Sequence, residues 1–497
     1  MAQRWGAFGE ARPRAAAALL GLAVLTRAPP AQAQPTSNDY AVDLYQGPIL
    51  ASARTLSMGG AYAGYAEGIG GYTNNAASPA MRHQSSLSWW DFDIDGGLSF
   101  PLQLFENDDF DNSGDTDADY SNFIYLAGGL QLQAGPFGAG AFGDLQRYTL
   151  RFAPDADATV VTVGRYHLLG AWGFFGHQLM VGAGARALTL GISAPDTELT
   201  IFGISPQVGV VVRPDWTPFR FGATYRHAVK SQVSIGSGQS ETDGVVSAGN
   251  LVIPDRVQLP WEIEVGTAIQ VGARPLNPAW INPDDHEQEL RDRFERRRRR
   301  RLVVIRRRLL ALPPGDTRES TRERLLAEEA QRQELEANEM ERDLERLRDE
   351  RRAIAQGWPR DALLLTADLL VTGPVKNAIN LQSFLGQGQG QNPPAECTVV
   401  ASGGSVVFSP RLGLEAEPVP RYMHARFGTY FEPNRYRLTP DRCNDRVGRQ
   451  HFTFGLDVKL VTTTWWGLVP EVTYKLQGYG DVAPRYQSFG LGFGVWH

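Results

Sequence analysis

Apolar and polar residues alternate with a period of two along most of the chain after residue 84. Ile263 and Val265, for example, alternate with Glu262 and Glu264. Successive side chains of a β-strand point to opposite faces of a sheet, so the pattern predicts strands with one apolar and one polar face. Fourteen segments show it: 84–102, 120–133, 136–152, 158–172, 176–192, 197–213, 218–232, 259–273, 360–371, 404–416, 422–434, 450–463, 468–478 and 485–497.

The connections between these segments differ in length in a regular way. Most connections after even-numbered segments are short, and several after odd-numbered segments are long. An even number of antiparallel strands with unlike ends is typical of a transmembrane β-barrel, whose outer face is apolar and whose lumen is polar. We therefore predict an all-β transmembrane barrel of about 14 strands. A string of secreted β-sandwiches alternates in the same way and is the alternative.

The composition excludes two other classes of protein. No apolar run after residue 30 approaches the roughly 18 residues that a membrane helix needs, which argues against a helical membrane protein. The chain has 497 residues with 49 Lys+Arg and 55 Asp+Glu, a net charge of -6. A general nucleic-acid binder would carry a basic excess instead.

The first 33 residues read as a secretory signal peptide. Arginines precede the apolar run 15–25, and the small-residue pattern Ala31-Gln32-Ala33 follows it. This order is typical of a cleaved signal, whereas the alternative is a buried N-terminal helix. Together with the strand pattern, the signal predicts the cell outer membrane of a Gram-negative bacterium.

Residues 34–83 lie between the signal and the first predicted strand and contain a recognisable motif. Its residues are Arg54, Gly59, Gly60, Ala61, Tyr62 and Glu67, followed by Asn74 and Asn75. The segment resembles the opening of the outer-membrane long-chain fatty-acid transporter family (FadL/TodX type) and of related PorV-type barrels. In that family an Asn-Pro-Ala motif follows, and Asn75 stands here in place of the proline.

The resemblance implies an N-terminal hatch inside a fourteen-stranded barrel. It also implies passive uptake of hydrophobic small molecules, such as long-chain fatty acids or hydrocarbons, past that hatch. From the residues themselves, Gly59 and Gly60 allow a tight bend or a close approach to the wall. Arg54 either pairs with a lumen carboxylate such as Glu262 or Glu264 or contacts a ligand.

The connection 274–359 separates barrel segments 84–273 from 360–497 and changes to helical periodicity. Its core, Asp284 to Arg352, holds 20 basic and 19 acidic residues. Pro313-Pro314-Gly315 divides it into two helices, and Leu326, Leu344 and Ile354 belong to an apolar stripe on the second. We expect an antiparallel, coiled-coil-like hairpin, which falls after an even-numbered segment and hence on the periplasmic side.

A basic cluster lies on the first of these helices. It consists of Arg296, Arg297, Arg298, Arg299, Arg300, Arg301, Arg306, Arg307 and Arg308. These arginines either pair with the glutamates of the second helix or bind an anionic cell-wall polymer, lipid head groups or an acidic periplasmic partner.

The first long connection contains an acidic repeat. Asp109, Asp111, Ser113, Asp115 and Asp117 partly match the spacing of a calcium loop, but Tyr120 stands where a bidentate glutamate is expected. A solvated acidic loop is the simpler interpretation, so no cofactor is expected, with calcium as the weak alternative.

The two cysteines, Cys397 and Cys443, both fall in long connections. In an exported chain they can form one disulfide.

The sequence is compatible with three functions. The first is passive uptake of hydrophobic compounds; the second is a non-transporting barrel that acts in secretion or envelope tethering through the hairpin. The third, an outer-membrane hydrolase, has no Gly-x-Ser-x-Gly elbow to support it, so we expect no enzyme. A continuous apolar tunnel would favour uptake, and a sealed lumen with an exposed basic hairpin would favour tethering.

Overall fold

The computed structural model describes residues 37–83, 89–101, 119–151, 158–194, 197–231, 233–237, 239–248, 251–280, 282–359, 362–386, 398–439, 448–465 and 469–496. The predicted signal peptide, the acidic repeat 109–117 and both cysteines lie outside these residues. Within them, no group of three or more His, Cys, Asp or Glu side chains could hold a metal ion.

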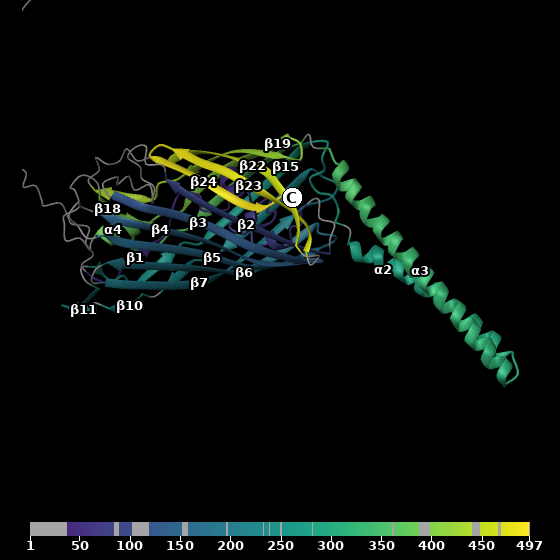
Figure 1. Cartoon of the computed structure of the whole chain (residues 1–497). Coiled ribbons are helices and arrows are strands. Elements are labelled where there is room, and N and C mark those ends of the chain that lie inside the picture. The colour runs from purple at the N-terminus through teal and green to yellow at the C-terminus, as the bar shows by residue number, and fades with distance from the viewer. Residues whose placement is uncertain are drawn as a thin grey trace, which may run out of the picture.

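Fourteen of the described strands form one closed antiparallel barrel (Figure 1). Each strand pairs with its neighbours, and the ring is completed where the first barrel strand pairs with the last. Each of the fourteen predicted segments overlaps one strand of this barrel, so the predicted fold is confirmed. The strands are β2 (Trp90–Pro101), β3 (Asp119–Ala134), β4 (Phe137–Arg151), β5 (Thr159–Phe174), β6 (Leu179–Ala194), β7 (Thr197–Val212), β8 (Phe219–Arg226), β15 (Glu262–Gly272), β16 (Ala362–Thr372), β19 (Val407–Val419), β20 (Met423–Glu432), β22 (Arg449–Trp465), β23 (Val469–Ala483) and β24 (Tyr486–Val495).

The two faces of the barrel wall follow the sequence alternation. Ile263 and Val265 are 40% and 45% exposed on the outside, whereas Glu264 between them is completely buried in the lumen. At one end, four connections are short turns at 135–136, 175–178, 213–218 and 420–422; we call this the short-turn end and the opposite one the long-loop end. Exposed aromatic side chains gather near the short-turn end, as at a membrane interface: Trp90, Phe137, Trp172, Phe175, Trp216, Phe219 and Tyr422.

No helix in the described part of the chain is long and apolar enough to cross a membrane.

Residues 37–83 fill the lumen, and we call them the hatch. They contain β1 (Ala41–Asp43), α1 (Ala53–Ser57) and two 3-10 turns, η1 (Ile69–Gly71) and η2 (Ser78–Ala80). The side chain of Ser52 caps α1 by accepting a hydrogen bond from the Thr55 amide. From residue 51 to 82 every residue is buried except Arg54, Gly70 and Thr73, which are half-buried.

The hatch begins at the long-loop end, where it joins a cap made from the long connections. There β1 is a middle strand of a six-stranded sheet in the order β21-β18-β17-β1-β14-β9. The cap also contains a short helix and a three-stranded sheet near this end (Figure 1). Its elements are β9 (Val229–Ser231), β10 (Ser234–Ser237), β11 (Gln239–Thr242), β12 (Val245–Ala248), β13 (Leu251–Val252), β14 (Arg256–Leu259), β17 (Ala378–Asn380), α4 (Leu381–Gly386), β18 (Thr398–Ser402) and β21 (Tyr436–Thr439).

The inner wall beside this cap is apolar. Val163 on β5, Leu190 on β6 and Ile201 on β7 face inward and pack against Val42 of β1 and Phe384 of α4. The principal apolar cluster of the described molecule therefore lies inside the long-loop half of the barrel.

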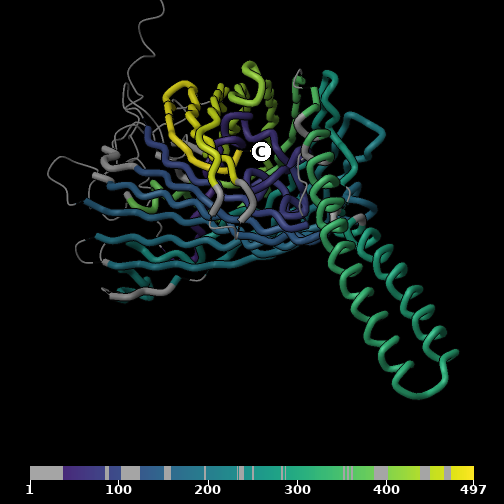
Figure 2. Tube along the Cα trace, turned by 45° about the vertical axis from the view of Figure 1, so that its right-hand side comes forward, coloured from purple at the N-terminus to yellow at the C-terminus, as the bar shows by residue number. Residues whose placement is uncertain are grey.

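A helical hairpin projects from the short-turn end, well clear of the barrel (Figure 2). It consists of α2 (Pro283–Leu310) and α3 (Asp316–Gly357), separated by a turn in which Gly315 adopts a φ of 139°. Asn282 caps α2, and Pro283 occupies its first turn, where the missing amide proton costs nothing.

The contact between the two helices is more polar than the sequence predicts. Leu344 is buried between the helices as predicted. Leu326 and Ile354, which belong to the same predicted stripe, are 44% and 64% exposed, so the prediction was wrong for these two residues. The cause is Arg301, which reaches across from α2 to Glu329 and Glu336 and turns a charged side of α3 inward.

Candidate functional site: the hatch and its seat in the barrel

The motif glycines of the hatch lie where its backbone touches the wall. Gly59 and Gly60 have positive φ values of 62° and 69°, which favour glycine. A Cβ at position 59 would stand 2.7 Å from the amide nitrogen of Thr429 in β20. Ala61 and Tyr62, which follow, are fully buried. The pair therefore bends the chain and brings it against the wall at the same place.

The wall provides the matching surface with glycines of its own. At several strand positions an added Cβ would overlap the hatch, so only glycine fits. These wall glycines surround the hatch from most sides: Gly138, Gly182, Gly209, Gly222, Gly413, Gly428 and Gly455. The number of glycines in the strands indicates that another part of the backbone approaches the wall closely. It does not show which segment that is.

Arg54 pairs with the wall through Glu415. Its Nη2 lies 2.6 Å from Glu415 Oε1 on β19, and its Nε donates to the other carboxylate oxygen at 3.0 Å. Tyr65 lies against the guanidinium group, with its ring centroid 5.0 Å away. Pairing with a lumen carboxylate was one of our two interpretations, but the expected partners, Glu262 and Glu264, were the wrong ones.

Glu415 belongs to a charged row across three neighbouring strands. Arg426 on β20 lies directly opposite it and bonds to it, and the same guanidinium group bonds to Asp457 on β22 at 2.5 and 2.8 Å. Because cross-strand neighbours on one face lie within reach of each other, such rows form readily in a lumen. Arg54 thus joins an existing wall network.

Glu67 is the second anchor. Its carboxylate accepts a hydrogen bond from Arg220 Nη1 on β8 at 2.7 Å and from the Tyr65 hydroxyl at 2.7 Å. Arg220 is fully buried and also donates to Asn277 Oδ1 and to the Leu276 carbonyl, at 2.7 and 2.6 Å. Residues 276–277 precede the hairpin, so this arginine links hatch, wall and hairpin base.

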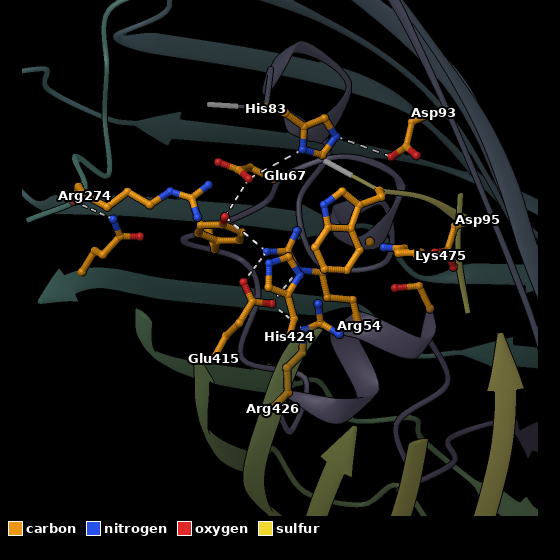
Figure 3. A pocket seen from close by; sticks show the side chains of 15 residues that line it. Arg54, Glu67, His83, Asp93, Asp95, Arg274, Glu415, His424, Arg426 and Lys475 are labelled. Carbon is orange, nitrogen blue, oxygen red and sulfur yellow. Dashed lines mark hydrogen bonds and ion pairs between the residues drawn. The ribbon is translucent and has the colours of Figure 1, made fainter. Parts of the chain in front are cut away.

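His83 bridges the hatch to the first barrel strand. Its Nδ1 lies 3.8 Å from Glu67 and its Nε2 lies 3.7 Å from Asp93 on β2 (Figure 3). Burial opposes the charged imidazolium, but Asp93 and Glu67 outweigh it and raise the pKa of His83 above its ordinary value. Burial would also raise the pKa of Glu67, but Arg220 and His83 hold that pKa well below its usual range.

Asn74 and Asn75 connect the hatch to the opposite side of the wall. Asn74 donates to Glu264 Oε1 at 2.8 Å and to the Gly60 carbonyl at 2.9 Å. Asn75 donates to the Ala63 and Val210 carbonyls, and its Oδ1 accepts from the Ala77 amide at 3.0 Å. The side chain of Asn75 thus stabilises the turn at the position where the family has proline.

Two polar cavities flank the hatch. One, of about 70 Å³, is lined by residues that include Arg54, Glu67, His83, His424 and Lys475 (Figure 3). The other, of about 110 Å³, lies against residues 45–51. An apolar cavity of about 150 Å³ is the size that accommodates benzene. Neither of these two cavities reaches that volume, so neither holds a hydrocarbon-sized ligand in this state.

We expect the pH dependence of stability to report the His83 bridge. A group with a raised pKa stabilises the fold fully below its unfolded pKa, about 6.5 for histidine, and loses this effect as pH rises through the folded value. The difference in thermal unfolding temperature between wild type and His83→Gln should therefore be largest near pH 6 and shrink at higher pH. A difference in unfolding temperature that grows as pH rises above 6 would contradict a stabilising role of the charged His83. Below about pH 4.3 the contribution of Glu67, whose pKa is lowered, should also fade.

Several anchors of the site were not singled out in the sequence. Besides Arg220 and Arg426, they include two wall arginines that donate to hatch carbonyls: Arg226 to Thr73 at 2.8 Å and Arg411 to Gly60 at 3.3 Å. All four lie on the polar faces of predicted strands. The sequence shows each of them as an arginine on the lumen face of a strand with few charges. The alternation of polar and apolar residues does not show which residue of the hatch or wall each arginine contacts.

No protein-family model matches the chain, and no curated protein matches it. Among solved structures, it is similar to the CymD monoaromatic hydrocarbon channel, with 8% identity and a TM-score of 0.43 over 91% of this chain and 97% of that one. It is also similar to a FadL homologue from Pseudomonas aeruginosa, with 9% identity and a TM-score of 0.42 over 92% and 98%. A third is the toluene transporter TodX of Pseudomonas putida, with 9% identity and a TM-score of 0.41 over 92% and 99%. The closed barrel itself is established by the strand pairing.

Proposed function

We propose that the protein is an outer-membrane barrel for passive uptake of hydrophobic small molecules, such as long-chain fatty acids or hydrocarbons. The observation that carries the proposal is the apolar inner wall of the long-loop half. A water-filled barrel has a polar interior, whereas Val163, Leu190 and Ile201 present an apolar one here. A molecule that enters among the cap elements would find apolar partners there.

The polar seat of the hatch supports a gated route. The buried part of the hatch and its ion pairs with the wall, Arg54–Glu415 and Glu67–Arg220, lie between the apolar half and the short-turn end. Because both cavities beside the hatch are small, a hydrophobic compound needs a hatch rearrangement or a lateral opening to leave. On this route the closed hatch would also hold back water and small hydrophilic solutes.

The orientation belongs to this proposal. The long-loop end faces outward and the short-turn end, with the hairpin, faces the periplasm, as expected for barrels with short periplasmic turns. The proposal includes no enzymatic step and no cofactor.

The rival function is a non-transporting barrel that tethers or secretes. The small volumes of the two cavities beside the hatch and the exposed hairpin favour it. An apolar inner wall, however, is a feature that a tether does not need, so uptake is the better-supported function.

Uptake by intact cells tests the proposal. A Gram-negative host without its own hydrophobic uptake barrels would express the full chain and receive a radiolabelled long-chain fatty acid, a monoaromatic hydrocarbon and a sugar. We expect faster accumulation of at least one hydrophobic probe than in cells with empty vector, and no change for the sugar. Equal rates for all probes with and without the protein would favour the rival function, and faster sugar entry would indicate an open pore.

A further inference from the structure

The distal half of α2 carries an arginine segment, residues 296–308, with nine arginines and no acidic residue. Eight of the nine arginines are exposed, and Arg301 is half-buried. Such a density of positive charge on one short stretch of helix is repulsive unless it is neutralised. The question is therefore what neutralises it.

The glutamates of α3 do so for only one arginine. Arg301 bonds to Glu329 and Glu336, which holds its pKa above the ordinary value. Arg296 and Arg299 pair backward along α2 with Asp292 and Glu295. Five guanidinium groups make no hydrogen bond or ion pair to any described residue: those of Arg298, Arg300, Arg306, Arg307 and Arg308.

The arrangement of these five groups differs from that of a helix that lies on a membrane. A membrane-surface helix has an apolar face flanked by basic residues. At 3.6 residues per turn, Arg298, Arg300 and Arg306 point in three different directions around α2. The exposed Val303 and Val304 lie between arginines and not on a face of their own. A charge distribution of this kind suits a ligand that wraps the helix.

The position of the segment also separates it from the barrel's own membrane. It begins 13 residues into α2, about 20 Å along a helix that rises 1.5 Å per residue. Both views place the tip of the hairpin away from the short-turn end (Figures 1 and 2).

We propose that the arginine segment binds an anionic cell-wall polymer that bears carboxylate groups, and so anchors the barrel to the cell wall. The guanidinium fork matches carboxylate geometry with two parallel hydrogen bonds. A flexible polymer with spaced carboxylates can reach arginines on several sides of a helix, which a flat bilayer cannot. The inference goes beyond uptake and needs only the outer-membrane placement of the barrel.

Binding to isolated peptidoglycan sacculi tests it with the full-length protein in detergent. One variant changes Arg298, Arg300, Arg306, Arg307 and Arg308 to Gln. The matched control changes five exposed arginines of α3 to Gln: Arg322, Arg324, Arg332, Arg342 and Arg346. Both lose the same charge from the same hairpin, and Gln is a good helix former. Circular dichroism and the heat-modifiable mobility of the barrel check that both variants stay folded.

At about 0.15 M salt we expect the α2 variant to co-sediment with sacculi about tenfold more weakly than wild type, a loss of about 1.4 kcal/mol. The α3 control should retain wild-type binding. Equal losses in both variants, or no binding by wild type, would overturn the proposal. So would wild-type binding to phosphatidylglycerol vesicles in place of sacculi. Uptake by the α2 variant should be unchanged, so a failure here is distinct from a failure of the uptake function.

Discussion

A disulfide that locks the hatch to the barrel wall is expected to stop uptake. Ala53 at the start of α1 and Gly492 on β24 are the sites: a Cβ at 492 would lie 3.4 Å from that of Ala53. Disulfide-bonded cysteines have Cβ atoms about 3.5–4.5 Å apart. A small shift away from the Gly96 carbonyl, which an added Cβ at 492 would meet at 3.1 Å, should let the double variant Ala53→Cys/Gly492→Cys oxidise. Neither cavity beside the hatch can hold a benzene-sized molecule, so on the proposed gated route α1 has to shift.

The measurement is hydrophobic-probe uptake by cells before and after a membrane-permeant reductant. Oxidised cells should show the rate of cells without the protein, and reduction should restore the wild-type rate. The single variants Ala53→Cys and Gly492→Cys control for the side chains themselves. Full uptake through the oxidised double variant would show that compounds pass without movement of α1, for instance through the barrel wall.

Removal of the buried arginine at the base of the hatch is expected to have the largest effect on stability. In Arg220→Met the apolar side chain fills much of the volume but donates nothing, so Glu67 loses its main cationic partner and Asn277 an additional bond. Breaking a buried ion pair by removing one partner costs about 3–5 kcal/mol. The free energy of unfolding in urea, followed by tryptophan fluorescence of the refolded barrel, should fall by about this amount.

A double variant separates the pair from its surroundings. Glu67→Gln with Arg220→Met removes both charges, so it should be more stable than the sum of the single variants predicts. If Arg220→Met costs less than about 1 kcal/mol, as an exposed surface pair would, the link between hatch, wall and hairpin base is not an anchor.

The barrel wall was predictable because lipid and lumen impose opposite demands on alternate residues. Ile263 and Glu264 show this: one is exposed on the apolar outside and the other is buried among arginines. The alternation with a period of two is a local property, so each strand can be recognised from its own sequence alone. The closing pair β2 and β24 was implied only by the even count, because nothing local marks two strands nearly 400 positions apart as neighbours.

The partners inside the lumen were much harder to predict. Glu262, Glu264 and Glu415 all lie on polar strand faces, and alternation does not say which of them meets Arg54. That choice depends on the height and rotation of the hatch, which are decided by close backbone contact at glycines such as Gly182 and Gly428. The hairpin shows the same limit: its helices were predicted from periodicity, but their facing sides depend on the long reach of Arg301.

The path of the hatch limits the order in which this molecule can be assembled. The chain enters at the long-loop end, where β1 is hydrogen-bonded on both sides, and leaves at the short-turn end, where Arg82 bonds to the Gly135 carbonyl. Residues 37–83 could not enter a barrel that is already closed, because β1 would have to pass through the whole lumen. The ring, which the pairing of β2 with β24 completes, must therefore close around residues 37–83 and not before they lie inside it.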